Sequence, residues 1–137
     1  MRVLIADDHP SIRSALTLLL EQSNLDVVGS FANSHELLEW LKTQQTDLLL
    51  LDWELPGESS KKLLTILRSR YPSIRVIVLS SLPQTRVAAL QAGANCFVCE
   101  GEPPEYLLSS INSCCSSDKS NPLENNCREG TTDWAGK

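Results

Sequence analysis

The chain has 137 residues, of which 42% are hydrophobic and 21% are charged, and its formal net charge is -5. These values are typical of one soluble globular domain, and the acidic balance argues against general binding to nucleic acid or to an anionic membrane. The sequence contains no apolar stretch long enough to span a bilayer, and Asp7 and Asp8 interrupt the only apolar run near the N-terminus. We therefore expect a cytoplasmic protein without a signal peptide.

Short apolar runs alternate along the chain with segments of helical period. Several of these runs, such as residues 48–51 and 76–79, are apolar on both faces, as a parallel sheet covered by helices requires. The five strands that the pattern predicts are residues 3–6, 25–28, 47–51, 74–79 and 96–99.

An amphipathic segment follows each predicted strand. Pro10 suits the first turn of the first helix, Asn33 or Ser34 suits the cap of the second, and Pro72 ends the third. The apolar positions of the five helices lie within residues 12–20, 37–41, 63–71, 87–90 and 106–111. This (βα)5 order predicts an α/β, doubly wound, three-layer fold with right-handed connections.

The five cysteines do not form a recognisable metal or redox motif. Cys96 and Cys99 lie three residues apart in a predicted strand, so their side chains point to opposite faces. The chain has no second pair at the spacing of zinc ligands. We expect the cysteines to be reduced and partly buried.

Polar residues stand at the ends of the predicted strands, where ligands bind in folds of this kind. Asp7 and Asp8 end the first strand and Asp52 ends the third. Ser80 ends the fourth and Glu100 follows the fifth. Because these strand ends meet at one edge of the sheet, the three aspartates predict a site for a hard divalent cation. Mg2+ fits such a site, since it prefers oxygen ligands from one or two carboxylates, water and an incoming phosphate.

Four segments together resemble one known family. They are the Asp7-Asp8 pair, "LLLLDWELPG" with Asp52, Ser80 after "VIVL", and "QAGANCFV" leading into the fifth strand. Over about residues 1–115 the chain resembles the receiver domain of bacterial two-component response regulators. The "DDHPSIR" segment is most similar to regulators that carry a LuxR/NarL-type DNA-binding domain. The resemblance implies a flavodoxin-like three-layer sandwich whose five-stranded parallel sheet has the order 2-1-3-4-5.

The resemblance also implies a role for each matching residue. Asp52 would accept a phosphoryl group from a sensor histidine kinase or a phosphotransfer protein. Ser80 would donate a hydrogen bond to a phosphoryl oxygen, and Ser80 and Phe97 would form the switch. The fourth helix, fifth strand and fifth helix would then bind a downstream protein partner. The implied Mg2+ ligands are Asp7, Asp8, Asp52 and the backbone carbonyl of Glu54.

Glu100 departs from the pattern of the family, which has a lysine at this position. A carboxylate beside three others disfavours the phosphorylated state, because each unit-charge contact at ~4 Å and a dielectric constant near 20 is worth roughly 4 kcal/mol. Two compensations remain open. Glu100 turns into solvent, or Arg86 near the start of the fourth helix reaches the site.

We expect the receiver domain to span residues 1–116 and a flexible polar tail to span residues 117–137. Trp134, an isolated large apolar residue of that tail, is either a docking anchor or incidental. The tail is too short and polar to supply a helix-turn-helix, so we expect no direct DNA binding by this chain.

Two functions fit these residues. The first is a single-domain response regulator in phosphorelay signalling that is phosphorylated at Asp52. The second is a degenerate pseudo-receiver that binds a protein partner independently of phosphorylation, which Glu100 favours. We expect no enzyme activity beyond self-phosphorylation from a donor and autodephosphorylation. His9 is interpreted as a helix-start residue and not as an acid–base group.

Overall fold

The computed structural model describes residues 1–115, so the predicted tail at 117–137 and Trp134 lie outside the described residues. The strands are β1 (Arg2–Ala6), β2 (Asp26–Phe31), β3 (Leu48–Asp52), β4 (Arg75–Ser80) and β5 (Cys96–Cys99). The helices are α1 (Pro10–Gln22), α2 (Ser34–Leu41), α3 (Ser60–Arg70), α4 (Arg86–Ala92) and α5 (Pro104–Cys115), with a 3-10 turn, η1 (Pro83–Thr85), before α4.

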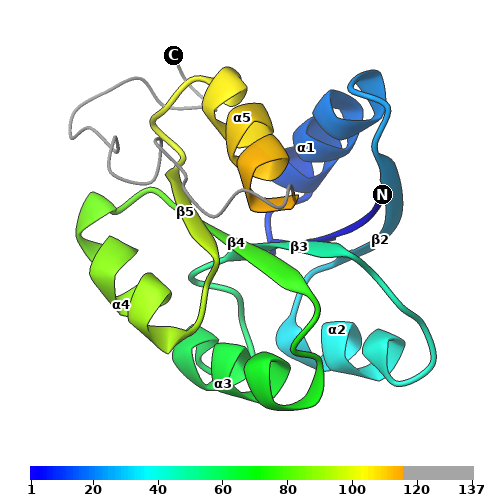
Figure 1. The fold of residues 1–137 in the computed structure, drawn as a ribbon, viewed down its shortest axis with the longest axis vertical. Coiled ribbons are helices and arrows are strands. Elements are labelled where there is room, and N and C mark those ends of the chain that lie inside the picture. Colours follow the sequence, from blue (N-terminus) through cyan, green and yellow to red (C-terminus); the bar gives the residue numbers. More distant parts are fainter. Residues whose placement is uncertain (116–137) are drawn as a thin grey trace.

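The five strands form one parallel sheet in the order β2-β1-β3-β4-β5 (Figure 1). Helices α1 and α5 cover one face of the sheet, and α2, α3 and α4 cover the other. The predicted three-layer fold and strand order are therefore confirmed. Within the described residues, no helix is long and apolar enough to cross a membrane.

The central strand β3 shows why the sheet needs helices on both faces. All five of its residues are buried. Leu49 and Leu51 pack in the cluster with α2, α3 and α4, whereas Leu48 and Leu50 pack in the cluster with α1 and α5. Alternate residues of a strand point to opposite faces, so a run of leucines stabilises both layers at once.

The cysteines only partly match the expectation. Cys96 and Cys99 pack in the clusters on opposite faces of the sheet, as their spacing predicts. Cys96 and Cys114 are buried. Cys99 is disulfide-bonded, so the prediction of reduced cysteines is wrong for this residue. Spacing along the chain shows which face a cysteine occupies, but not which thiols folding brings together.

Candidate functional site

Four side chains with metal-binding groups meet at the carboxyl ends of β1 and β3. These two strands are neighbours in the sheet, so the residue after β1 and the last residue of β3 lie at the same edge. One carboxylate oxygen from each of Asp7, Asp8 and Asp52 and one ring nitrogen of His9 all lie within 4.8 Å of one another. The structure thus brings together the three aspartates that the strand ends singled out, and it adds a histidine.

Asp7 is held firmly and carries a buried, unused oxygen. Its side chain is 2% exposed, and its Oδ1 accepts a hydrogen bond of 2.8 Å from the backbone N–H of His9. Its backbone carbonyl accepts a 2.7 Å bond from the guanidinium of Arg13. Among residues 1–115, its Oδ2 has no hydrogen-bond partner. A buried carboxylate oxygen without a partner is costly, so this oxygen suits a cation.

Asp52 is the other buried carboxylate of the cluster, with 7% of its surface exposed. Its Oδ1 accepts a 3.0 Å hydrogen bond from the backbone N–H of Glu54. Burial raises the pKa of Asp52 to about 6, and the charges of Asp7 and Asp8 add to this rise. The Glu54 N–H and the nearby His9 oppose the rise. Ionised Asp52 therefore lowers the stability of the fold at neutral pH, and a bound cation would offset this cost.

His9 is the residue whose place in the site was missed. It is the N-cap of α1, which agrees with its interpretation as a helix-start residue. Its Nδ1, however, lies 3.0 Å from Asp7 Oδ1 and 3.1 Å from Asp8 Oδ1. The hydrogen bond to Asp7 and the charge of Asp8 raise the pKa of His9 above its ordinary value. The sequence signal was its position directly after two aspartates.

Ser80 and Glu100 lie at the carboxyl ends of β4 and β5, on the same side of the sheet as the acidic cluster. Ser80 ends β4 and is 3% exposed. Its Oγ accepts a 3.0 Å hydrogen bond from the backbone N–H of Leu82 and shares a 3.2 Å hydrogen bond with the hydroxyl of Thr85. The backbone N–H of Glu100 donates a 2.9 Å bond to the Ser80 carbonyl. Glu100 is half-buried, and Arg86 is the first residue of α4. The structure thus places Glu100 directly after β5, beside the end of β4 at Ser80.

The β3–α3 loop fixes the residues beside Asp52. Gly57 has a φ of 109°, and a Cβ there would lie 2.1 Å from Ser34 Oγ. That Ser34 oxygen accepts a 2.9 Å bond from the backbone N–H of Glu58. At the other end of the loop, the hydroxyl of Ser60 donates to the carbonyl of Trp53. The close approach and the positive φ both require glycine at this turn.

Phe97 lies in the core and not on the surface. It is in β5, pairs in register with Val78 of β4, and is 2% exposed. Its ring packs in the cluster with α2, α3 and α4. Phe97 is therefore on the strand that pairs with β4, and β4 ends at Ser80.

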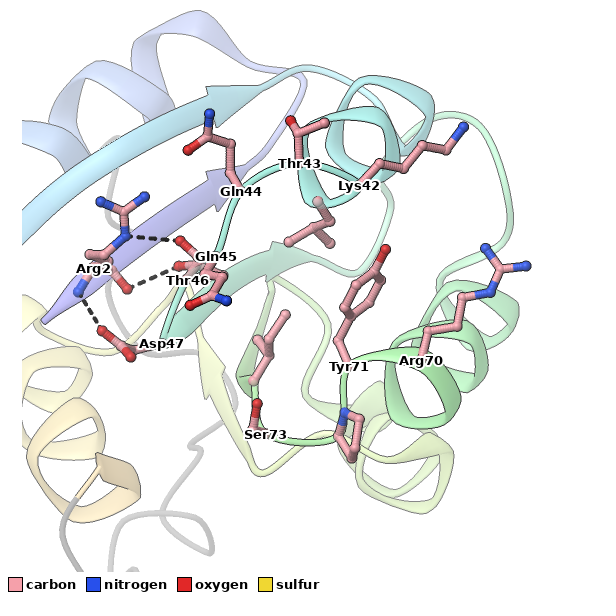
Figure 2. Close-up of a pocket in the computed structure, with 13 residues that line it drawn as sticks. Arg2, Lys42, Thr43, Gln44, Gln45, Thr46, Asp47, Arg70, Tyr71 and Ser73 are labelled. Atoms are coloured by element: carbon pink, nitrogen blue, oxygen red, sulfur yellow. Dashed lines mark hydrogen bonds between the residues drawn. The ribbon is translucent and has the colours of Figure 1, made fainter.

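A cavity lies at the opposite end of the strands, where their amino ends are. It has a volume of about 810 Å3 and lies between the loops that precede β3 and β4 (Figure 2). Asp47 Oδ2 accepts a 2.8 Å bond from the backbone N–H of Arg2, and the Arg2 side chain donates a 2.9 Å bond to the Gln45 carbonyl. These contacts tie the start of β1 to the loop before β3. The cavity is therefore separate from the acidic cluster.

Comparison with known proteins identifies the fold family. The family model described as "Response regulator receiver domain" matches residues 3–112. The chain belongs to the response regulator receiver family. This confirms the resemblance seen in the sequence, and it makes the chain a receiver domain of two-component signalling, a family that generally signals and does not catalyse.

Two curated relatives show how much of a longer regulator this receiver domain resembles. The Fimbriae Z protein of Salmonella typhimurium is 39% identical over 99 residues, which are 70% of this chain and 47% of that protein. The nitrate/nitrite response regulator protein NarL of Escherichia coli is 31% identical over 112 residues, which are 80% of this chain and 52% of that protein. The chain therefore spans about half the length of these relatives.

A solved structure agrees with the receiver fold over nearly its whole length. The isolated REC domain of RcsB from Salmonella enterica serovar Typhimurium, solved in the presence of the phosphomimetic BeF3-, matches with a TM-score of 0.83 and 27% identity. The match covers 92% of this chain and 96% of that one. A structure of two RcsB dimers bound to two DNAs matches with the same TM-score of 0.83. In that case the match covers 92% of this chain and 66% of the longer RcsB chain.

Proposed function

We propose that this receiver domain accepts a phosphoryl group at Asp52 in the presence of Mg2+ and thereby switches a protein-interaction face. One observation carries the proposal. A buried carboxylate, with its pKa raised to about 6, stands at the end of β3 beside two further carboxylates. Such a group is costly to keep as a structural residue and is suited to covalent phosphoacceptor chemistry.

The chemistry of the cluster fits Mg2+. Asp7, Asp8, Asp52 and the backbone carbonyl of Glu54 would hold the ion, since Mg2+ binds oxygen ligands. The buried Asp7 Oδ2, to which no described residue donates a hydrogen bond, supports this assignment. When bound, Mg2+ would neutralise part of the charge on the phosphoryl oxygens.

The residues of the chain can carry out the transfer. Asp52 Oδ1 is engaged by the Glu54 N–H, so Oδ2 is the oxygen that attacks phosphorus in the phosphohistidine of a sensor kinase or phosphotransfer protein. A P–O bond to Asp52 forms while the P–N bond breaks, and the electron pair remains on the departing imidazole nitrogen, which takes up a proton. The Ser80 oxygen accepts a hydrogen bond from the Leu82 N–H, and the Thr85 hydroxyl donates to the Leu82 carbonyl. The Ser80 hydrogen therefore points to Thr85 in this structure, and it would turn to donate to a phosphoryl oxygen.

Ser80 also provides the link to the output face, formed by α4, β5 and α5. Its bond with Thr85 joins β4 to η1, which leads directly into α4. A shift of Ser80 toward a phosphoryl group would therefore move the start of α4. Two exposed apolar side chains, Leu82 (39%) and Val87 (57%), lie in this segment and suit a downstream protein partner. The buried Phe97 of β5 would respond from inside the same face.

We further propose the boundaries 1–116 for the receiver domain and 117–137 for the tail. The family match up to residue 112 and the end of α5 at Cys115 support the first boundary. We also propose that residues 1–116 do not bind DNA directly. The acidic charge of the chain supports this, because DNA binding depends on cationic contacts to phosphates.

Glu100 favours a second candidate function. The Glu100 backbone is held beside Ser80, and a carboxylate turned toward the site would repel a phosphoryl group. The domain would then bind its partner independently of phosphorylation. This pseudo-receiver would keep the fold and the cation site but lose the covalent switch. Self-phosphorylation separates the two functions, whereas cation binding alone does not.

The deciding experiment is the intact mass of the protein after incubation with Mg2+ and acetyl phosphate. The proposed function predicts the gain of one phosphoryl group in the wild type and no gain in Asp52→Asn. A wild type that binds Mg2+ but gains no mass would establish the pseudo-receiver instead. A gain that persists in Asp52→Asn would refute Asp52 as the acceptor.

A further inference from the structure

His9 occupies the N-cap of α1 without using its side chain as a cap. Cap residues commonly accept a hydrogen bond from one of the first backbone N–H groups of their helix. In the described part of the chain, His9 makes no such bond. Its ring turns instead toward the carboxylates, and its Nδ1 lies against both Asp7 and Asp8. The sequence places His9 at a helix start, but the fold places its imidazole in the acidic cluster.

The spacing of these atoms matches that of ligands around one cation. Ligands lie about 2.1 Å from Mg2+ and about 2.0 to 2.2 Å from Zn2+. Neighbouring corners of an octahedron with that radius are separated by about 3.0 Å, the radius multiplied by the square root of two. His9 Nδ1 lies 3.0 Å from Asp7 Oδ1 and 3.1 Å from Asp8 Oδ1. The nitrogen thus lies at a spacing that suits adjacent ligands of one cation, and the contact to Asp7 is a hydrogen bond while no cation is bound.

A second observation, the buried Asp7 oxygen without a partner among the described residues, also points to a bound cation. Asp7 is 98% buried at its side chain, since only 2% is exposed, and across residues 1–115 its Oδ2 finds no hydrogen-bond donor. The backbone N–H and the ring of His9 both approach the other oxygen, Oδ1. His9 therefore engages one carboxylate oxygen of Asp7, and the other oxygen is buried and has no described donor.

We propose that the His9 imidazole is a nitrogen ligand of this site, so that the site binds Mn2+ and later transition-metal dications more tightly than Mg2+. The proposal rests on the cation site of the proposed function. Carboxylate and water oxygens suit both Mg2+ and Mn2+, whereas imidazole nitrogen adds affinity mainly for transition metals. One nitrogen among three carboxylates therefore shifts the preference of the site.

The tautomer of His9 is part of this assignment. With its hydrogen on Nδ1, the ring donates to Asp7 across the 3.0 Å contact. With its hydrogen on Nε2, Nδ1 has a lone pair for the cation. The His9 side chain is 66% exposed, so solvent can exchange this hydrogen. Protein geometry need not change between the two arrangements.

The test uses the tag-free chain of 137 residues, with Mn2+ as the probe. His9→Asn is the main variant, because asparagine is a good N-cap and offers an oxygen in place of the nitrogen. His35→Asn is the matched control, since His35 is the other histidine of the chain and is exposed on α2. Pulsed electron paramagnetic resonance detects 14N coupling from an imidazole bound to Mn2+. The Mn2+ dissociation constant comes from the signal of free Mn2+, and that of Mg2+ comes from competition.

We expect imidazole 14N coupling in the wild type and in His35→Asn, and its loss in His9→Asn. The Mn2+ affinity falls roughly tenfold in His9→Asn, whereas the Mg2+ affinity changes less than about threefold. Mn2+ bound without imidazole coupling in the wild type would overturn the role of His9 and leave the phosphoacceptor proposal intact. No binding of either ion would overturn both. Thermal unfolding of each variant shows that the fold is retained.

Discussion

Replacing Asp52 with asparagine removes a charge that the folded protein accommodates at a cost. Asp52 is 7% exposed and lies in a cluster with two other carboxylates. Asparagine has the same shape and keeps an oxygen to accept the bond from the Glu54 N–H. We therefore expect Asp52→Asn to be more stable than the wild type when no divalent cation is present, although it loses the proposed phosphoacceptor.

The expected gain follows from the pKa of Asp52. This value rises from its ordinary 3.8 to about 6 in the folded state, mainly because of burial. Each pKa unit corresponds to about 1.4 kcal/mol, so ionised Asp52 lowers the free energy of unfolding by about 3 kcal/mol near pH 7.5. Between pH 3.8 and 6 the folded state holds the proton more tightly than the unfolded state. The wild type therefore loses stability as the pH rises through this window.

The assay is urea and thermal unfolding in EDTA near pH 7.5 and near pH 4.5. Asp52→Asn should gain about 3 kcal/mol at the higher pH, an increase of about 10 °C in Tm, and only about 1 kcal/mol at the lower pH. The control is Asp26→Asn at the exposed start of β2, which should change stability by less than about 0.5 kcal/mol. An equal gain at both pH values, or no gain near pH 7.5, would refute the assignment of a raised pKa to the buried carboxylate.

Three further predictions test the surroundings of this carboxylate. Glu100→Lys should raise the yield or lifetime of the phosphorylated protein about fivefold in intact-mass time courses, because a like charge becomes an opposite one near the phosphoryl group; an unchanged lifetime would show that the Glu100 carboxylate points away. Gly57→Ala should lower the free energy of unfolding by about 1 to 3 kcal/mol in urea, since its φ is 109° and its Cβ would lie 2.1 Å from Ser34 Oγ; a loss below about 0.5 kcal/mol would contradict the tight turn. Adding Mg2+ should change the fluorescence of Trp53 saturably and EDTA should reverse it, whereas Asp7→Asn should weaken the response at least tenfold; an unaltered titration in Asp7→Asn would exclude Asp7 as a ligand.

Glu100 determines how phosphorylation of the wild type and of Glu100→Lys is interpreted. Its backbone is fixed beside Ser80 by a 2.9 Å hydrogen bond, so it cannot leave this edge of the sheet without breaking β5 pairing. A phosphorylated wild type would show that the cation and Ser80 suffice despite the carboxylate residue. An unphosphorylated wild type that Glu100→Lys rescues would identify this one residue as the cause of the lost switch.

Periodicity alone determined the class of fold and the edge where the site lies. Runs such as residues 48–51 are apolar at every position, which only a strand covered on both faces satisfies. Asp7, Asp52 and Ser80 follow or end such runs, and parallel strands bring their carboxyl ends together. These inferences depend on local order along the chain, which is what a sequence records.

Strand limits were less predictable where pairing extends an element. The second strand was predicted at 25–28, but β2 runs from Asp26 to Phe31. Gly29 and Ser30 lack the apolar character of a strand, yet they pair with Leu4 and Ile5 of β1. Hydrogen bonds to a neighbouring strand, and not the propensity of the residues, decide the limit here.

Only the tertiary structure decided the chemistry of individual groups in the site. Burial of Asp52 raises its pKa, and the turn before α1 brings the His9 ring between Asp7 and Asp8. The disulfide bond of Cys99 likewise depends on which thiols folding brings together. Desolvation, side-chain direction and contacts between distant residues arise only when the layers pack. For this reason the sequence located the site, whereas the fold determined which atoms act in it.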